Sequence, residues 1–265
     1  MQEKKLPPPS EFDPLVWTEH RSFVTLPESL DMTDLHPVSI FRLFMTDLML
    51  DTIVESTNAY AGAKFAGATG RGWVDLSEAE LVIWIAIVIY QGLYSMPSNE
   101  NYWNTDSRTP VHEISRHMKL LRYEQIKRYL HISPPEGSSR DFFDKLEPLL
   151  SHVRDTSKRL YTPSSNVSVD EMMIRFSGRS AHTIRMKNKP VPEGYKVLAL
   201  CDAGYTYAFL PESRIESNVE LSDGTLTIHE DDFPLSTTGK KVMYLAEQLP
   251  KFQNQKFDIY MDNFF

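Results

Sequence analysis

Two aspartates stand where a carboxylate is costly unless it has a partner. Asp170 follows Val169 and precedes an apolar Met-Met-Ile run, and Asp262 directly follows the run Ile259–Met261. A carboxylate in an apolar strand loses its hydration, so it needs an ion-pair partner or a metal ion. If the two strands are parallel neighbours, both side chains converge, and ligands that are all oxygen suit Mg²⁺ or Mn²⁺.

The chemistry that such a carboxylate pair supports is phosphoryl transfer. Two divalent ions about 4 Å apart activate an attacking oxygen and stabilise a leaving oxygen at phosphorus. The alternative is structural, because an aspartate at a strand end commonly caps a turn by accepting hydrogen bonds from backbone N–H groups. Spacing alone leaves both interpretations open, and turn capping is the more common of the two.

The elements that must position these aspartates are strands joined by a crossover helix. Alternating apolar residues predict strands over 166–176, 183–186, 195–201, 205–210 and 257–261, and helical spacing predicts a helix over 239–249. A helix between the last two strands allows the first and last strands to lie side by side and parallel. The strongly acidic segment 211–236 between them is predicted to be a solvated loop.

The preceding residues are predicted to be helical. Periodicity predicts helices over 37–60, 78–92, 111–130 (one or two) and 142–160, with Ser77 as an N-cap. The apolar run 81–90 is far shorter than the roughly 20 residues that span a bilayer, which favours a helix packed on several sides. We therefore expect three parts: an extended or disordered lead-in (1–30), a helical domain (31–160) and a sheet domain (161–265).

Composition narrows the function classes. The formal net charge is -8 and the chain has one cysteine, so a disulfide framework is excluded. The N-terminus lacks the apolar core of a signal peptide, which favours a soluble intracellular protein. Two windows, 116–131 and 171–200, are nevertheless rich in Lys and Arg. They suit contacts with DNA phosphates, and the alternative is an ordinary solvated charged face.

Three blocks of the sheet domain resemble those of piggyBac-type transposases, and they occur in the same order. They are Ser168–Arg179, around the first catalytic aspartate of that family; Lys187–Pro190 with Gly194–Lys196 and Leu200–Tyr205; and Tyr260–Phe265, around the second catalytic aspartate. The helical part resembles the N-terminal domain of the family more loosely. With it, the resemblance covers residues from about 35 to 265.

The resemblance implies an α+β fold, in which an N-terminal helical domain for dimerisation and DNA contact precedes an incomplete ribonuclease H-like mixed sheet with a crossover helix. It implies cut-and-paste DNA transposition in the nucleus. Asp170 and Asp262 would be the catalytic residues and the ligands of Mg²⁺ or Mn²⁺. The expected partners are DNA, as terminal repeats and target site, and a second copy of the chain, with no membrane and no small-molecule substrate. The basic residues expected to contact DNA are Arg175, Arg179, Lys187 and Lys189.

The same resemblance places a third catalytic aspartate downstream of Phe265, so we expect this chain to be inactive by itself. Two nearby acids are weak substitutes. Asp202 is interpreted as a turn residue, and Glu171 should point to the opposite face of its strand from Asp170. Two other hypotheses remain: a domesticated derivative that binds DNA or a partner without cutting, and an unrelated α+β interaction protein whose aspartates cap turns.

Overall fold

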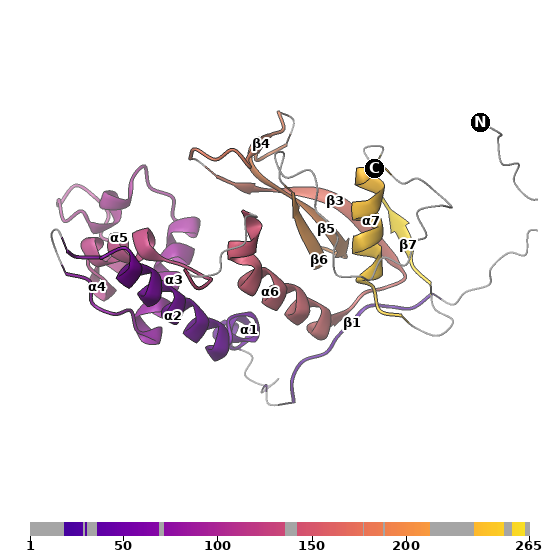
Figure 1. Cartoon of the computed structure of the whole chain (residues 1–265), viewed down its shortest axis with the longest axis horizontal. Coiled ribbons are helices and arrows are strands. Elements are labelled where there is room, and N and C mark those ends of the chain that lie inside the picture. Colours follow the sequence, from indigo (N-terminus) through magenta and orange to yellow (C-terminus); the bar gives the residue numbers. More distant parts are fainter. Residues whose placement is uncertain are drawn as a thin grey trace, which may run out of the picture. The chain divides into compact units, whose positions relative to one another are not determined.

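The computed structural model describes residues 19–28, 30, 36–68, 72–135, 142–176, 178–187, 189–212, 236–251 and 256–262. The chain forms two compact units, one made of residues 28–156 and the other of residues 1–27 with 157–265. The first unit is helical, and the second carries the main sheet (Figure 1). Of the acidic segment 211–236, residues 213–235 lie outside the described residues.

The helical unit contains short helices that begin at polar caps. The single helix predicted over 37–60 is two helices, because Thr46 accepts a hydrogen bond from the backbone N–H of Met49 at 3.3 Å and starts a new one. Ser77 caps the next helix as predicted, accepting from Glu80 N–H at 3.3 Å. The helices are α1 (Pro37–Phe44), α2 (Asp47–Ala63), α3 (Glu78–Leu93), η2 (Asn99–Trp103), α4 (Ile114–His117), α5 (Leu120–Tyr129) and η3 (Phe143–Leu146), with α6 (Glu147–Leu160) running on to the second unit.

Helix α3 is only partly enclosed. Leu81 and Ile87 are buried in the core of the helical unit. Val88, Ile89 and Leu93 are exposed, at 40%, 50% and 75%. The prediction that the apolar run 81–90 packs on several sides therefore holds for its first half, where Leu81 is buried and the four residues after it pack against the core, but not for Val88 and Ile89. None of the described helices has the length and apolarity to cross a bilayer.

The second unit is built on a five-stranded sheet. A separate short pair, β1 (Phe23–Val24) with β2 (Tyr161–Thr162), ties the N-terminal segment to this unit. In the main sheet β5 lies next to β3 on one side, and β6 and β4 share its other side, while β7 pairs with the far edge of β3. The strands are β3 (Asn166–Arg175), β4 (Ile184–Arg185), β5 (Glu193–Asp202), β6 (Tyr205–Glu212) and β7 (Asp258–Tyr260).

The β3–β5–β6 part follows directly from the sequence. Along β3 buried and exposed residues alternate from Val167 to Met172, whereas β5 is buried almost continuously, as in a strand that is covered on both faces of the sheet. The turn between β5 and β6 has positive φ at Ala203 (48°) and Gly204 (85°), the backbone of a two-residue type I′ hairpin. A Cβ on Gly194 would collide with the carbonyl oxygen of Ile174 in β3, so only glycine fits there.

Helix α7 (Thr237–Glu247) makes the crossover from β6 to β7 (Figure 1). Ser236 caps it by accepting from Gly239 N–H at 3.0 Å. Val242, Leu245 and Leu249 bury its apolar face against the sheet, in a core that includes Val169 and Leu200. As predicted, β7 pairs with β3 in parallel. The mixed helix and sheet fold is confirmed.

Candidate metal centre

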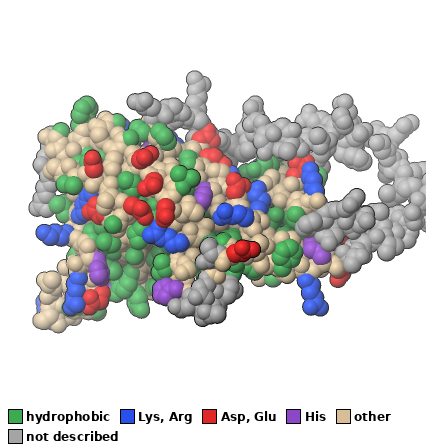
Figure 2. All heavy atoms as spheres, turned by 90° about the horizontal axis from the view of Figure 1, so that it is seen from below, with side chains coloured by type: hydrophobic (Ala, Val, Ile, Leu, Met, Phe, Trp, Pro, Cys, Tyr) green, Lys and Arg blue, Asp and Glu red, His purple; other side chains and the backbone are tan. Residues whose placement is uncertain are grey.

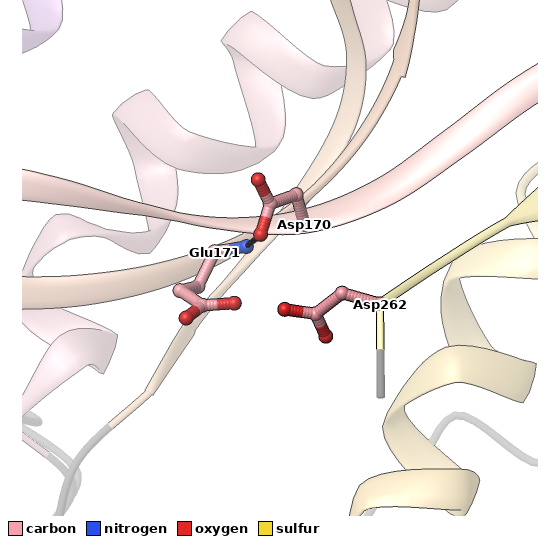
Figure 3. Close-up of side chains that lie close together, drawn as sticks. All are labelled: Asp170, Glu171 and Asp262. Atoms are coloured by element: carbon pink, nitrogen blue, oxygen red, sulfur yellow. Dashed lines mark hydrogen bonds between the residues drawn. The ribbon is translucent and has the colours of Figure 1, made fainter. Parts of the chain in front are cut away.

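The parallel pairing of β3 with β7 sets the positions of the two aspartates. The last paired residues are Ser168 and Tyr260. Asp170 and Asp262 each follow two residues after this pair, so their side chains are expected on the same face of the sheet. One carboxylate oxygen from each aspartate and one from Glu171 lie within 4.8 Å of one another (Figure 3). The predicted convergence of Asp170 and Asp262 is therefore confirmed as geometry.

The Glu171 carboxylate lies closer to the two aspartates than the strand pattern indicated. Its exposure does alternate with that of Asp170, since Asp170 is exposed and Glu171 is buried. Among the described residues, the pairing of β3 with β7 ends at Ser168, and the N–H of Glu171 donates to Asp170 Oδ1 at 2.7 Å. In Figure 3 the carboxylates of Glu171 and Asp262 face each other beside the strand. The period-of-two rule gives the different exposure of the two side chains, but it does not show that the Glu171 carboxylate still comes within 4.8 Å of those of Asp170 and Asp262.

Lys189 contributes a positive charge to this carboxylate group. Its Nζ lies 3.4 Å from Glu171 Oε1 and 3.8 Å from Asp170 Oδ1, and it donates to the Glu171 carbonyl oxygen at 3.5 Å. The sequence suggested Lys189 as a DNA contact. The structure places it first of all as a counter-ion of two acidic side chains. A lysine some twenty residues from an aspartate carries no spacing signal for such a contact, so the sequence offered no way to find it.

Asp202 does not join the carboxylate group. It is buried, and its oxygens accept from Tyr161 Oη at 3.0 Å, from Ser164 N–H at 2.6 Å and from Ser164 Oγ at 3.0 Å. Burial, reinforced by the neighbouring Asp202 carboxylate, raises the pKa of Tyr161, which keeps the phenol protonated as a donor. Asp202 thus holds the start of the sheet together, in line with its interpretation as a structural residue.

The other basic residues singled out from the sequence are at the surface. Arg175, Arg179 and Lys187 are exposed, and they stand near the end of β3 and in the segment around β4. Figure 2 shows Lys and Arg side chains interspersed with Asp and Glu on the face that it presents, with hydrophobic side chains between them. That face carries mixed charge, and a uniformly basic surface is not seen there.

The composition of the carboxylate group suits a hard divalent cation. Asp170, Glu171 and Asp262 offer only oxygen ligands. Glu171 Oε2 is buried and has no hydrogen-bond partner among the described residues. A buried carboxylate oxygen without a partner is costly, and a bound cation would remove that cost. The residues present therefore fit a divalent ion.

Comparison with known proteins identifies the class. The profile of the family described as Transposase IS4 matches residues 36–265, which is most of the chain. The chain therefore belongs to this transposase family.

Its relatives within the family are of the piggyBac type, as the motif blocks indicated. The chain is 27% identical over 234 residues to the human piggyBac transposable element-derived protein 3, covering 86% of this chain and 36% of that protein. It is also 27% identical over 240 residues to the human piggyBac transposable element-derived protein 2, covering 90% of this chain and 38% of the relative. The chain thus spans well under half the length of these relatives.

A solved structure agrees on the fold. It is described as the cryo-EM structure of a piggyBac transposase synaptic complex with hairpin DNA, and it matches with a TM-score of 0.58 at 23% identity. The match covers 80% of this chain and 43% of the other. The sequence-derived assignment to piggyBac-type transposases is confirmed.

Proposed function

We propose that this chain forms the first part of a metal-dependent DNA transposase core, in which Asp170 and Asp262 hold the catalytic ions. The observation that carries the proposal is the convergence of their carboxylates, with Glu171, at the end of the parallel β3–β7 pair. Asp170 and Asp262 are exposed, so what a cation would offset is the mutual repulsion of carboxylates held this close together. The ion class that suits three carboxylates is Mg²⁺ or Mn²⁺.

The arrangement of the sheet supports a ribonuclease H-like core. Three antiparallel strands in the order β6, β5, β3 are followed by a crossover helix and a parallel fourth strand beside β3. This order brings the first and last strands together, so that residues distant in sequence share one site. Divalent ions bound there would activate an attacking oxygen and stabilise the leaving oxygen at phosphorus. The chain's own part is to hold the carboxylates at the strand ends.

DNA is the proposed substrate and partner. Arg175, Arg179 and Lys187 are exposed on the unit that carries the carboxylates, and their charge suits the phosphate backbone. Contacts of this kind position DNA without reading its sequence. For the helical residues 31–160 we propose the dimerisation and DNA-contact role that the family resemblance implies, and for the whole protein a nuclear location.

A second candidate is a domesticated derivative that binds DNA or a partner without cutting it. It is favoured by the names of the two human relatives, which describe both as transposable element-derived proteins. The two candidates differ in whether the carboxylates act on DNA, and not in fold.

A nicking assay tests the first proposal. The full product of the gene is incubated with plasmid carrying the terminal repeats that flank the gene, with Mg²⁺ or Mn²⁺ and with EDTA. We expect nicks that need the divalent ion and disappear in Asp170→Asn. Asp258→Asn is the matched control, because it removes a carboxylate from the other end of β7. Equal nicking by wild type and Asp170→Asn overturns the catalytic role, and DNA binding with no nicking by wild type favours the domesticated derivative.

A further inference from the structure

Glu171 is a buried carboxylate that the proposed pair of catalytic aspartates does not use. Its side chain is only 5% exposed, whereas that of Asp170 is 65% exposed. Glu171 Oε2 has no hydrogen-bond partner among the described residues. Figure 3 shows the Glu171 carboxylate directed at Asp262. An acid with little access to water and one unsatisfied oxygen, aimed at a second acid, requires a positive charge between them.

Lys189 supplies only part of that charge. Its Nζ is 3.4 Å from Glu171 Oε1, longer than a charge-assisted hydrogen bond of about 2.8 Å. Its distance from Asp170 Oδ1 is longer still, at 3.8 Å. The Lys189 side chain is 30% exposed, so its flexible stem can carry the ammonium away from the acids and into water. Lys189 therefore has the properties of a replaceable counter-ion.

We propose that Glu171 is a third carboxylate ligand of the divalent ion, supplied by this chain itself, and that Lys189 is the counter-ion which the incoming metal displaces. The inference rests on the proposed function for the presence of the ion. It adds a ligand and a competitor that the assignment of Asp170 and Asp262 does not contain. Metal binding exchanges one ammonium at long range for a cation in contact with all three carboxylates. No bond to carbon or phosphorus changes in this exchange.

The test is Mn²⁺ binding by the purified chain without DNA, measured by electron paramagnetic resonance of free and bound Mn²⁺ at constant pH. We expect Glu171→Gln and Asp170→Asn each to weaken binding at least 10-fold, because each removes one anionic ligand. Lys189→Met keeps the stem and removes the charge, so we expect it to tighten binding several-fold. Asp258→Asn is the control for loss of a carboxylate elsewhere on β7, and it should bind as wild type does.

The outcomes separate this inference from the proposed function. Wild-type binding that is lost in Asp170→Asn but unchanged in Glu171→Gln overturns the role of Glu171 and leaves the two aspartates in place. Absence of Mn²⁺ binding by the wild-type chain overturns the third-ligand proposal, while the nicking assay on the full gene product still decides the proposed function. Weaker binding in Lys189→Met overturns displacement. Circular dichroism of each variant in EDTA shows that the fold is kept, and an infrared difference spectrum on adding Mn²⁺ should lose a carboxylate band in Glu171→Gln.

Discussion

Glu171 and Glu212 are two largely buried glutamates in neighbouring parts of one sheet, and their charges are handled in opposite ways. Glu212, at the end of β6, has Lys241 of α7 at 2.5 Å from Oε1 and Lys196 of β5 at 3.1 Å from Oε2. Glu171 has Lys189 at 3.4 Å from Oε1 and, within the described part of the chain, no hydrogen-bond partner for Oε2. The protein itself compensates the charge of the Glu212 carboxylate, whereas the charge of the Glu171 carboxylate is left for another partner to compensate.

The Glu212 group is a structural ion cluster. Burial would raise the pKa of Glu212, but the ammonium groups of Lys241 and Lys196 outweigh it, and the pKa is lowered overall. The Glu212 Oε2 atom makes no well-directed hydrogen bond, yet the Lys196 ammonium at 3.1 Å still compensates its charge. Because Lys241 belongs to α7, this cluster holds α7 against the sheet. Helix α7 in turn leads into β7 and Asp262. The compensated ion cluster at Glu212 thus helps to position β7 and Asp262, and Asp262 completes the carboxylate group that contains Glu171.

The largest expected effect comes from breaking the matched cluster. Glu212→Gln removes the anion that Lys196 and Lys241, which are 5% and 8% exposed, share. Removing one partner of a buried ion group costs about 3–5 kcal/mol, because the remaining charges stay buried and uncompensated. We expect the loss as faster amide hydrogen exchange in β5, β6 and α7, measured by mass spectrometry. Exchange as slow as in wild type would contradict it.

Two controls sharpen that result. Trp73, Trp84 and Trp103 lie in the helical unit, whereas the fourth tryptophan, Trp17, belongs to the other one. In a Trp17→Phe background, tryptophan fluorescence should therefore be unchanged if the effect is confined to the sheet. Glu212→Leu combined with Lys196→Met and Lys241→Met removes every charge of the cluster. A buried ion group replaced as a whole by apolar residues is often neutral in stability, so we expect most of the protection to return.

The comparison of the two glutamates also predicts that the stability contributed by Glu212 depends on pH, an effect of intermediate size. The folded-state pKa of Glu212 is below its ordinary value of 4.5, so the unfolded chain takes up the proton first as pH falls. The stability that Glu212 contributes is complete above about pH 4.5 and is lost as pH falls through the lower, folded-state pKa. The gap in urea midpoint between wild type and Glu212→Gln, followed by circular dichroism, should therefore be constant above pH 5 and close below it. A gap of equal size at pH 3 would show that this carboxylate does not act through its charge.

Much of the sheet unit could be predicted from the sequence, because its signals are local. Alternation identified β3, a turn triplet identified the β5–β6 hairpin, and helical spacing identified α7. The parallel β3–β7 pair then followed from chain topology, and with it the meeting of Asp170 and Asp262. These inferences succeed because period and turn chemistry are properties of neighbouring residues.

The two glutamates could not be predicted in the same way, because their partners are distant in sequence. Glu212 was assigned to the acidic loop from its neighbours' charge, but it ends β6 and contacts Lys196 and Lys241. Glu171 was placed away from Asp170 by strand periodicity, which predicts the face of a side chain but not how near its carboxylate comes to others. The alternation continues along β3, which stays paired with β5 as far as Arg175, so the approach of the carboxylates depends on β7 and on side-chain conformation, neither of which the local pattern contains.

The smallest effect is expected from the substitution Glu171→Gln in metal-free buffer, and it should contrast with the same substitution at Glu212. It removes a buried negative charge whose Oε2 has no hydrogen-bond partner in the parts of the chain that the structure describes, while Lys189, at 30% exposure, remains accessible to water. The lost ion pair and the relieved burial cost oppose each other, so we expect a change within about 1 kcal/mol of wild type, of either sign. Hydrogen exchange in β3 with EDTA present measures it. A loss as large as that at Glu212 would mean that Glu171 is also a structural ion, already matched by the protein, and that the difference between the two glutamates is one of distance alone.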